Sequence, residues 1–347
     1  MAYHFKNLVF EGGGVKGIAY TGAMEVLSEK GILQQIERVG GTSAGAINAV
    51  LIGLNYSLEE TKKVLWELNF NNFKDEPWGI PGDIHRLLNQ YGWYQGDFFR
   101  KWIGEVIQAK TGDSESTFAK INAQKAQKGF RDLYIIGTNL STHFSEVFSN
   151  EKTPDMPLAD AVRISMSIPL FFASKRSPRG DVYVDGGVLA NYPVKLFDRE
   201  KYVVENKLKT DYYDEHNAKL VQEGINISQY VFNKETLGFR LDSKEEIGIF
   251  RDQKEPVHYV IKDFVSYVKG LIGTVMDMQL NIHIHGDDWQ RTIYIDASAA
   301  NTTEFDLSDE KKNALAEAGR VGVKEYFQWY DNSSEPVNKP NPANPLV

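Results

Sequence analysis

The residues most able to perform chemistry lie in glycine-rich motifs near the amino terminus. Ser43 is the central residue of Gly41-Thr42-Ser43-Ala44-Gly45, a G-x-S-x-G sequence between a short apolar run and a strongly apolar segment, residues 44–54. A serine in that setting can occupy a sharp turn that only small neighbours tolerate, with its hydroxyl presented at the start of a helix. This arrangement is typical of a nucleophile that attacks an acyl carbon.

A second glycine cluster precedes this motif. Gly12, Gly14 and Gly17 satisfy G-x-G-x-x-G after the apolar run 7–10, a pattern that is also found in dinucleotide-binding loops. The P-loop pattern is not met, because Lys16 is not followed by Ser or Thr. Consecutive glycines can equally direct backbone amides at a developing oxyanion, or form no more than a tight turn. From this loop alone, the three interpretations remain open.

A nucleophilic serine needs a base, and the sequence offers a carboxylate for that role. Asp185-Gly186-Gly187 follows the apolar run 182–184, in a small-residue loop that allows a close approach to neighbouring backbone. Asp-Gly is also a strong signal for a hairpin turn. None of the histidines stands in a comparable loop after a late strand, where an α/β-hydrolase carries its histidine; they are His4, His85, His143, His216, His258, His283 and His285.

These motifs imply the elements that position them. A strand over 7–10, a helix from Gly17, a strand that ends at Gly41 and a helix over 44–54 follow one another in the order typical of a layered α/β sheet. Residues 55–130 combine helical periodicity with many charges and aromatic side chains, so we interpret them as a helical insertion or cap. The later expectations are strands over 133–138, 182–184 and 292–296, mainly helical structure over 199–285, and a closing helix over 311–330.

Together, the three motifs resemble the patatin-like phospholipase family in order and spacing. The likeness rests on residues 11–17, 41–45 and 185–187, and it extends to 163–169 (RISMSIP) and 191–194 (NYPV). Weaker similarity continues around 291–296 and through the closing helix. We therefore expect one patatin-like catalytic domain over 1–330 and a disordered tail over 331–347.

The resemblance implies a three-layer α/β/α fold around a mostly parallel sheet, and a hydrolase that cleaves fatty-acyl esters without a metal or organic cofactor. Carried over residue by residue, Ser43 is the nucleophile, Asp185 is its base, and the amides of the 12–14 turn form the oxyanion hole. Its three members are Gly12, Gly13 and Gly14. The supporting motif positions are Lys16, Gly17, Gly41, Gly45, Gly186 and Gly187; for Lys16, a solvated or structural role remains as plausible as a catalytic one.

Composition narrows the classes of partner and site. The chain has 39 Lys and Arg against 47 Asp and Glu, and this net charge of −8 disfavours unaided binding to nucleic acid. The absence of cysteine excludes thiolate nucleophiles, disulfides and cysteine-based metal sites. His283 and His285 have no third ligand, so no metal site is expected. No secretory leader and no apolar run of membrane-spanning length is visible, which predicts a cytoplasmic location and leaves signal-less secretion open.

Substrate and partners stay open at this stage. The leading hypothesis is a phospholipase A or lysophospholipase acting on membrane lipid or another fatty-acyl ester. The alternatives are a thioesterase or short-chain carboxylesterase on the same dyad, a non-catalytic storage or binding protein of the same fold and, more distantly, a nicotinamide-dependent dehydrogenase. A protein activator and peripheral membrane contact by the aromatic cluster at 78–102 are also left open; packing within the cap is the other interpretation of that cluster.

Overall fold

The computed structural model places most of the chain. It describes residues 3–73, 90–203, 205–225, 227–242, 258, 260–263, 266–268, 270–275, 287–302 and 304–332. Almost all of the tail expected from residue 331, and the histidines at 85, 283 and 285, lie outside the described residues. None of the helices in the described ranges is both long and apolar enough to cross a membrane.

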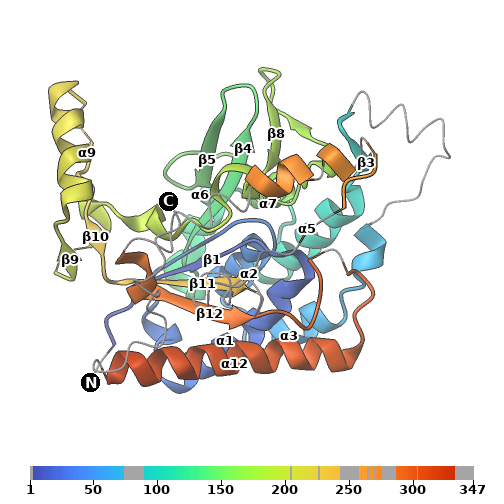
Figure 1. Ribbon diagram of the computed structural model, residues 1–347, viewed down its shortest axis with the longest axis horizontal. Coiled ribbons are helices and arrows are strands. Elements are labelled where there is room, and N and C mark those ends of the chain that lie inside the picture. Colours follow the sequence, from blue (N-terminus) through green and yellow to red (C-terminus); the bar gives the residue numbers. More distant parts are fainter. Residues whose placement is uncertain are drawn as a thin grey trace.

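A mixed sheet of mostly parallel strands forms the centre of the molecule (Figure 1). In the described part of the chain its order is β12-β11-β1-β2-β4-β8-β7, and β5 pairs with β4. Five strands run parallel to one another: β1 (Asn7–Phe10), β2 (Arg38–Gly41), β4 (Asp132–Asn139), β11 (Thr236–Asp242) and β12 (Thr292–Asp296). The antiparallel additions are β5 (Phe144–Ser149), β7 (Lys175–Arg176) and β8 (Val182–Asp185).

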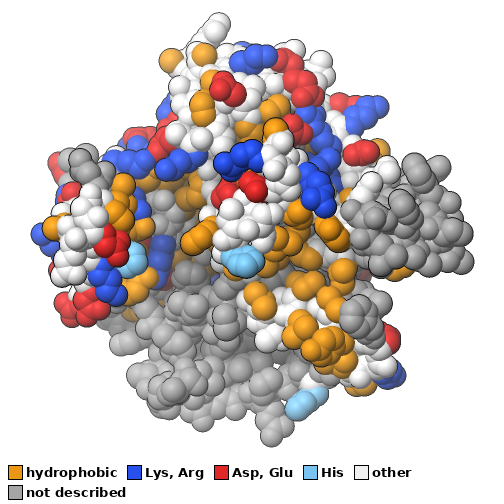
Figure 2. Space-filling model, turned by 90° about the horizontal axis from the view of Figure 1, so that it is seen from above, with side chains coloured by type: hydrophobic (Ala, Val, Ile, Leu, Met, Phe, Trp, Pro, Cys, Tyr) orange, Lys and Arg blue, Asp and Glu red, His pale blue; other side chains and the backbone are white. Residues whose placement is uncertain are grey.

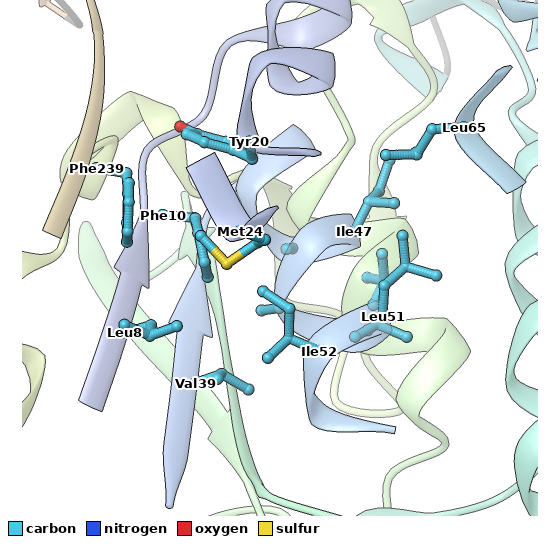
Figure 3. Packing of buried hydrophobic residues seen from close by; sticks show 14 of the residues in the cluster. Leu8, Phe10, Tyr20, Met24, Val39, Ile47, Leu51, Ile52, Leu65 and Phe239 are labelled. Atoms are coloured by element: carbon cyan, nitrogen blue, oxygen red, sulfur yellow. The ribbon is translucent and has the colours of Figure 1, made fainter. Parts of the chain in front are cut away.

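Side chains of the parallel strands alternate between two packed faces. Leu8 and Phe10 of β1 join the main hydrophobic core with residues of helices α1 (Ala19–Glu29) and α2 (Ala44–Gly53), as Figure 3 shows. Val9, which points to the other face, packs with Phe197 in a smaller cluster. The predicted α/β fold with a mostly parallel sheet is therefore confirmed. The smaller cluster is covered by short helical turns, η4 (Val194–Phe197) and η5 (Glu200–Tyr202).

The last helix of the described chain closes the main face. The closing helix predicted over 311–330 is present as α12 (Asp309–Asp331), which lies against α1 along the lower side of the molecule (Figure 1). The two backbones approach closely, because a Cβ at Gly22 would overlap with the Ala316 carbonyl and one at Gly319 with the Ala19 carbonyl. Glycine at both positions thus permits the contact.

The region 55–130 is largely helical where it is described. It contains α3 (Leu58–Trp66), α5 (Asp97–Thr111) and α6 (Phe118–Lys128), and α5 packs on α7 (Leu158–Ser165). A short strand, β3 (Gly92–Tyr94), pairs in parallel with β6 (Leu170–Phe172), which follows α7. The insertion therefore pairs with the strand that directly follows the 163–169 motif named in the sequence analysis.

The expectation of mainly helical structure over 199–285 was wrong in part. The described portion includes α9 (Asp211–Gln222), but also β9 (Lys207–Leu208), β10 (Phe232–Asn233) and the fully buried β11. Charged residues in β11 obscured its strand character in the sequence. Arg240 and Asp242 are both buried, and their side chains pair at 2.6 Å.

Candidate active site

Ser43 occupies a strained turn between β2 and α2. Its backbone dihedrals are φ 52° and ψ −124°, a region that residues other than glycine rarely adopt. The flanking glycines are required by crowding: a Cβ at Gly41 would overlap with the carbonyl of Gly45, and one at Gly45 with the carbonyl of Phe10. The G-x-S-x-G sequence therefore forms the sharp strand-to-helix turn that it predicts.

The end of helix α7 contacts Ser43. The Ser43 amide donates to Ser165 Oγ at 2.9 Å, and Ser43 Oγ lies 3.5 Å from the sulfur of Met166. All three residues are buried. Because the Ser43 amide already has an acceptor, it is not free to stabilise a negative charge on a substrate.

Asp185 ends strand β8 and is almost fully buried. Its amide donates to the carbonyl of Ser167 at 2.9 Å, and its Oδ1 accepts from the Gly187 amide at 2.7 Å. Burial raises the pKa of Asp185 to about 7; the hydrogen bonds from Gly187 and from the Ser43 hydroxyl act in the opposite direction. Oδ2 has no hydrogen bond of ordinary geometry from any described residue, and the Ser43 hydroxyl is the neighbour that can supply one.

The segment 165–167 thus fixes Ser43 and Asp185 through hydrogen bonds from their backbone amides. Ser165 binds the Ser43 amide and Ser167 binds the Asp185 amide. This segment is fixed in turn by Arg163, a buried side chain that donates to Ser167 Oγ at 2.6 Å and to the carbonyls of Gly96 and Ala173 at 3.0 Å each. The sequence contained these residues in the RISMSIP motif, but gave no indication of their contacts.

The glycine loop lies directly against the serine. A Cβ at Gly12 would stand 3.0 Å from Ser43 Cβ and would overlap with Asn191 Oδ1. The Gly12 amide donates to the Asn191 carbonyl at 3.1 Å, so it is already engaged. No hydrogen bond from the amides of Gly13 or Gly14 to a described residue is present. Gly14 has a φ of +56°, and a Cβ there would overlap with the Thr302 carbonyl.

The structure therefore brings the three sequence motifs to one place, at the carboxyl ends of β1 and β2. A family model of patatin-like phospholipases matches residues 8–198, which include all three. The chain belongs to the patatin-like phospholipase family.

Several known proteins are similar to this patatin-like chain in sequence or in fold. It is 30% identical to the protein YqhO of Bacillus subtilis over 334 residues, which are 92% of this chain and 98% of that protein. It is 25% identical over 214 residues to a protein named probable lipid hydrolase 463L of Invertebrate iridescent virus 6, covering 60% of this chain and 68% of the relative. The solved structure of VipD from Legionella pneumophila shares the fold, with a TM-score of 0.54, 16% identity and coverage of 94% of this chain and 67% of VipD.

A buried polar network supports the glycine loop of the patatin-like domain. Glu11 Oε1 accepts from the side chain of Asn191 at 3.2 Å, and its Oε2 accepts from the Leu241 amide at 2.7 Å. Asn191 also donates to the Gly12 carbonyl at 3.2 Å. Sequence reasoning quoted Glu11 and Asn191 only as parts of motifs, because their contact joins positions 180 residues apart.

The supporting motif residues have clear packing roles, with one exception. A Cβ at Gly17 would stand 3.1 Å from Ala44 Cβ, so this glycine lets the loop pack on the start of α2. Gly186 passes close to Ile136, whose carbonyl oxygen would lie 2.5 Å from an added Cβ. Lys16 is half-buried in the turn η1 (Gly14–Ile18). Within the described residues no group of three metal-ligating side chains occurs.

Proposed function

We propose that this protein is a lipid acyl hydrolase that cleaves fatty-acyl esters through an acyl-serine intermediate. Ser43 serves as the nucleophile and Asp185 as its general base. The observation that carries the proposal is a buried carboxylate beside the serine whose pKa of about 7 suits proton transfer at neutral pH. An ordinary aspartate, with a pKa near 3.9, would be too weak a base for a hydroxyl proton.

The first half of the reaction uses groups that lie in place. Ionised Asp185 takes the Ser43 proton on Oδ2 while Ser43 Oγ bonds to the ester carbon. The Ser43 hydroxyl lies 3.5 Å from Met166 Sδ and also close enough to the Asp185 carboxyl to lower its pKa by hydrogen bonding, so proton transfer needs only a small reorientation of the hydroxyl toward Oδ2. The tetrahedral intermediate then collapses, the ester C–O bond breaks, and protonated Asp185 returns its proton to the departing alkoxide. The product alcohol leaves and the acyl group stays on Ser43.

The second half repeats these steps with water. Asp185 takes a proton from water, the hydroxide bonds to the acyl carbon, and the bond to Ser43 Oγ breaks as the serine regains its proton. In both halves the oxyanion needs donors. We assign this role to the amides of Gly13 and Gly14, since the Gly12 and Ser43 amides are engaged elsewhere. A single donor of this kind contributes about 3 kcal/mol to the transition state.

Apolar side chains follow Met166, the residue whose sulfur lies 3.5 Å from Ser43 Oγ, and they support a fatty-acyl substrate. Met166 is followed by Ile168 and Phe171, which are only partly buried. The Phe171 ring packs against the rings of Tyr94 at 4.8 Å and Phe305 at 5.2 Å. An acyl chain that packed against these side chains would leave water and gain about 0.8 kcal/mol per buried methylene. The family description and the name of the viral relative agree with a lipid substrate.

A labelling experiment and a lipid panel test the proposal together. A fluorophosphonate probe should label Ser43 in the wild-type protein, and Ser43→Ala should remove both the label and ester hydrolysis without loss of folding. Mass spectrometry of products from diacyl lipids, lysolipids, acyl thioesters and short-chain esters then separates a phospholipase from a thioesterase or carboxylesterase. Labelling of another serine would contradict the assignment, and absence of both labelling and hydrolysis would favour a binding protein.

A further inference from the structure

Arg163 is a buried arginine on helix α7, just before the segment 165–167 that contacts Ser43 and Asp185. Figure 2 shows Lys and Arg side chains on the outer surface of the molecule, where water solvates their charge. The Arg163 side chain differs, because it is only 1% exposed. A guanidinium is stable away from water only where its N–H groups find acceptors. The groups that Arg163 binds therefore indicate what it does in the fold.

The acceptors of Arg163 lie in three separate parts of the chain. Nη1 donates to Ser167 Oγ at 2.6 Å, on the segment that contacts the proposed dyad. Nε donates to the Gly96 carbonyl at 3.0 Å and Nη2 donates to the Gln95 carbonyl, both within the insertion. Nη2 also donates to the Ala173 carbonyl at 3.0 Å, directly after β6. A planar guanidinium with its donors in a fixed geometry can hold all three parts at once, whereas a lysine ammonium cannot reproduce this pattern.

From Ser167 the contacts continue to the proposed base. The Ser167 hydroxyl also donates to the Arg163 carbonyl at 2.9 Å, so the serine side chain is held by both ends of the same arginine. The Ser167 carbonyl accepts from the Asp185 amide at 2.9 Å. Since Asp185 is the last residue of β8, this bond helps to set where its carboxyl group lies. Two residues, Arg163 and Ser167, thus connect the insertion segment 95–96 to the base.

The insertion approaches this arginine very closely. The Tyr94 carbonyl accepts from the Ala173 amide at 2.7 Å, which fixes the strand just before the contact. A Cβ at Gly96 would stand 2.5 to 2.6 Å from three atoms of the Arg163 guanidinium. Because the guanidinium is hydrogen-bonded to the insertion and to Ser167, it could not move away from an added Cβ without disturbing these bonds. A change at Gly96 would therefore be felt at Ser167.

We infer that Arg163 is a positioning residue for the proposed hydrolysis, which couples the insertion segment 95–96 to Asp185 through Ser167. The inference rests on the proposed function, because it concerns the step in which Asp185 accepts the Ser43 proton. Proton transfer requires the two groups within hydrogen-bond reach, so a small displacement of Ser167 slows the chemical step more than it weakens substrate binding. The insertion then contributes to catalysis, although the proposed mechanism uses none of its residues.

Two glycines at the ends of one helix give a matched pair of variants. Gly96 precedes α5 and Gly112 follows it, and their φ values are +73° and +91°. Alanine is strained at both positions, but an added Cβ meets Arg163 only at Gly96; at Gly112 no atom of a described residue lies within 4 Å. Gly96→Ala should lower kcat for a water-soluble ester about tenfold or more and leave KM within about twofold, measured well below its melting temperature. Gly112→Ala should lose thermal stability but keep both constants within about twofold of the wild type.

Arg163→Lys shows whether Gly96→Ala acts through the arginine. This variant alone should also lower kcat, because lysine cannot hold Ser167 and the insertion together. Lysine lacks the guanidinium atoms that the added Cβ would meet, so introducing Gly96→Ala into Arg163→Lys should change kcat by less than about twofold. If Arg163→Lys does not fold, the comparison of Gly96→Ala with Gly112→Ala decides by itself, since both keep the arginine.

The outcomes separate this inference from the proposed function. Equal kcat in Gly96→Ala and Gly112→Ala would overturn the coupling alone, and so would a full tenfold loss when Gly96→Ala is added to a folded Arg163→Lys. A higher KM with unchanged kcat in Gly96→Ala would overturn it as well, and would assign the segment 95–96 to substrate binding. Absence of soluble-ester turnover in the wild type would contradict the proposed function, and the positioning role with it.

Discussion

Replacing Asp185 by asparagine separates its role in catalysis from its effect on folding. Burial raises the pKa of this carboxyl from 3.8 to about 7, although hydrogen bonds from Gly187 and Ser43 act in the opposite direction. One pKa unit corresponds to about 1.4 kcal/mol. Keeping Asp185 ionised therefore destabilises the folded state by about 4 kcal/mol above pH 7.

The sign of the pH dependence follows from the two protonation states. The unfolded chain releases the Asp185 proton near pH 4, whereas the folded chain keeps it until near pH 7. Between these values the folded state binds more protons. The contribution of Asp185 to stability is therefore fully present below about pH 4 and is lost as the pH rises toward 7. Asparagine does not titrate, so the variant should gain stability relative to the wild type over this interval.

The size of the change includes one opposing effect. The asparagine amide nitrogen would take the place of Oδ2, which accepts no hydrogen bond of ordinary geometry from the described residues. A buried donor without an acceptor costs about 1–3 kcal/mol. We expect Asp185→Asn to be less stable than the wild type near pH 4 by about this amount, and more stable by about 1–3 kcal/mol near pH 8. Urea unfolding at both pH values measures the difference.

As the pH rises from 4 to 8, the esterase activity of the wild type should increase, whereas the contribution of Asp185 to its stability decreases. Wild-type kcat/KM for a soluble ester should rise with pH through an inflection near 7, because only ionised Asp185 accepts the Ser43 proton. Asp185→Asn should lose about 10²–10⁴-fold above pH 7, and the difference from the wild type should narrow at lower pH, where Asp185 is protonated. The reasoning is refuted if the variant keeps wild-type turnover, or if the two stability curves run parallel between pH 4 and pH 8. Loss of turnover in one of the seven histidine variants instead would show a triad.

Two further substitutions test the packing around the site. Ser165→Ala leaves the buried Ser43 amide without its acceptor, so we expect the free energy of unfolding to fall by about 1–3 kcal/mol. We also expect kcat/KM to fall, which the loss of a merely structural residue would not cause. Unchanged kcat/KM would contradict a positioning role for Ser165. Gly14→Ala should abolish soluble-ester turnover, since the added Cβ would overlap with the Thr302 carbonyl. Gly31→Ala is its control: Gly31 also has a positive φ, of +70°, but open space around it, so only thermal stability should fall, by about 1–2 kcal/mol.

The sequence predicted those parts of the fold whose cause is local. The turn at Ser43 depends on small neighbours within two positions, and α12 begins after Ser308, whose side chain accepts from the Lys311 amide. Both could be read from short stretches of residues. The buried strand β11 could not, because Arg240 and Asp242 look like surface residues until their pairing inside the fold is known.

For the candidate active site, too, the sequence predicted the parts that depend on short motifs. Ser43, Asp185 and the glycine loop have recognisable motifs, so their proximity could be expected. Ser165, which holds the Ser43 amide, is 122 positions away from it, and serine is too common for such a contact to be inferred from sequence. The engagement of the Gly12 amide by Asn191 likewise required the structure, and it reduces the three expected oxyanion donors to the two that we propose.

The bracing of the glycine loop has a consequence for the timing of activity during synthesis. The groups that hold this loop come much later in the chain than residues 12–14 themselves. Asn191 accepts from the Gly12 amide, Leu241 packs so close to Gly13 that an added Cβ would overlap with it, and the Thr302 carbonyl accepts from the Val15 amide at 3.2 Å. A growing chain that has exposed Ser43 therefore still lacks the framework for its proposed oxyanion donors. We expect hydrolytic activity to appear only after the chain has been synthesised beyond residue 302 and has folded.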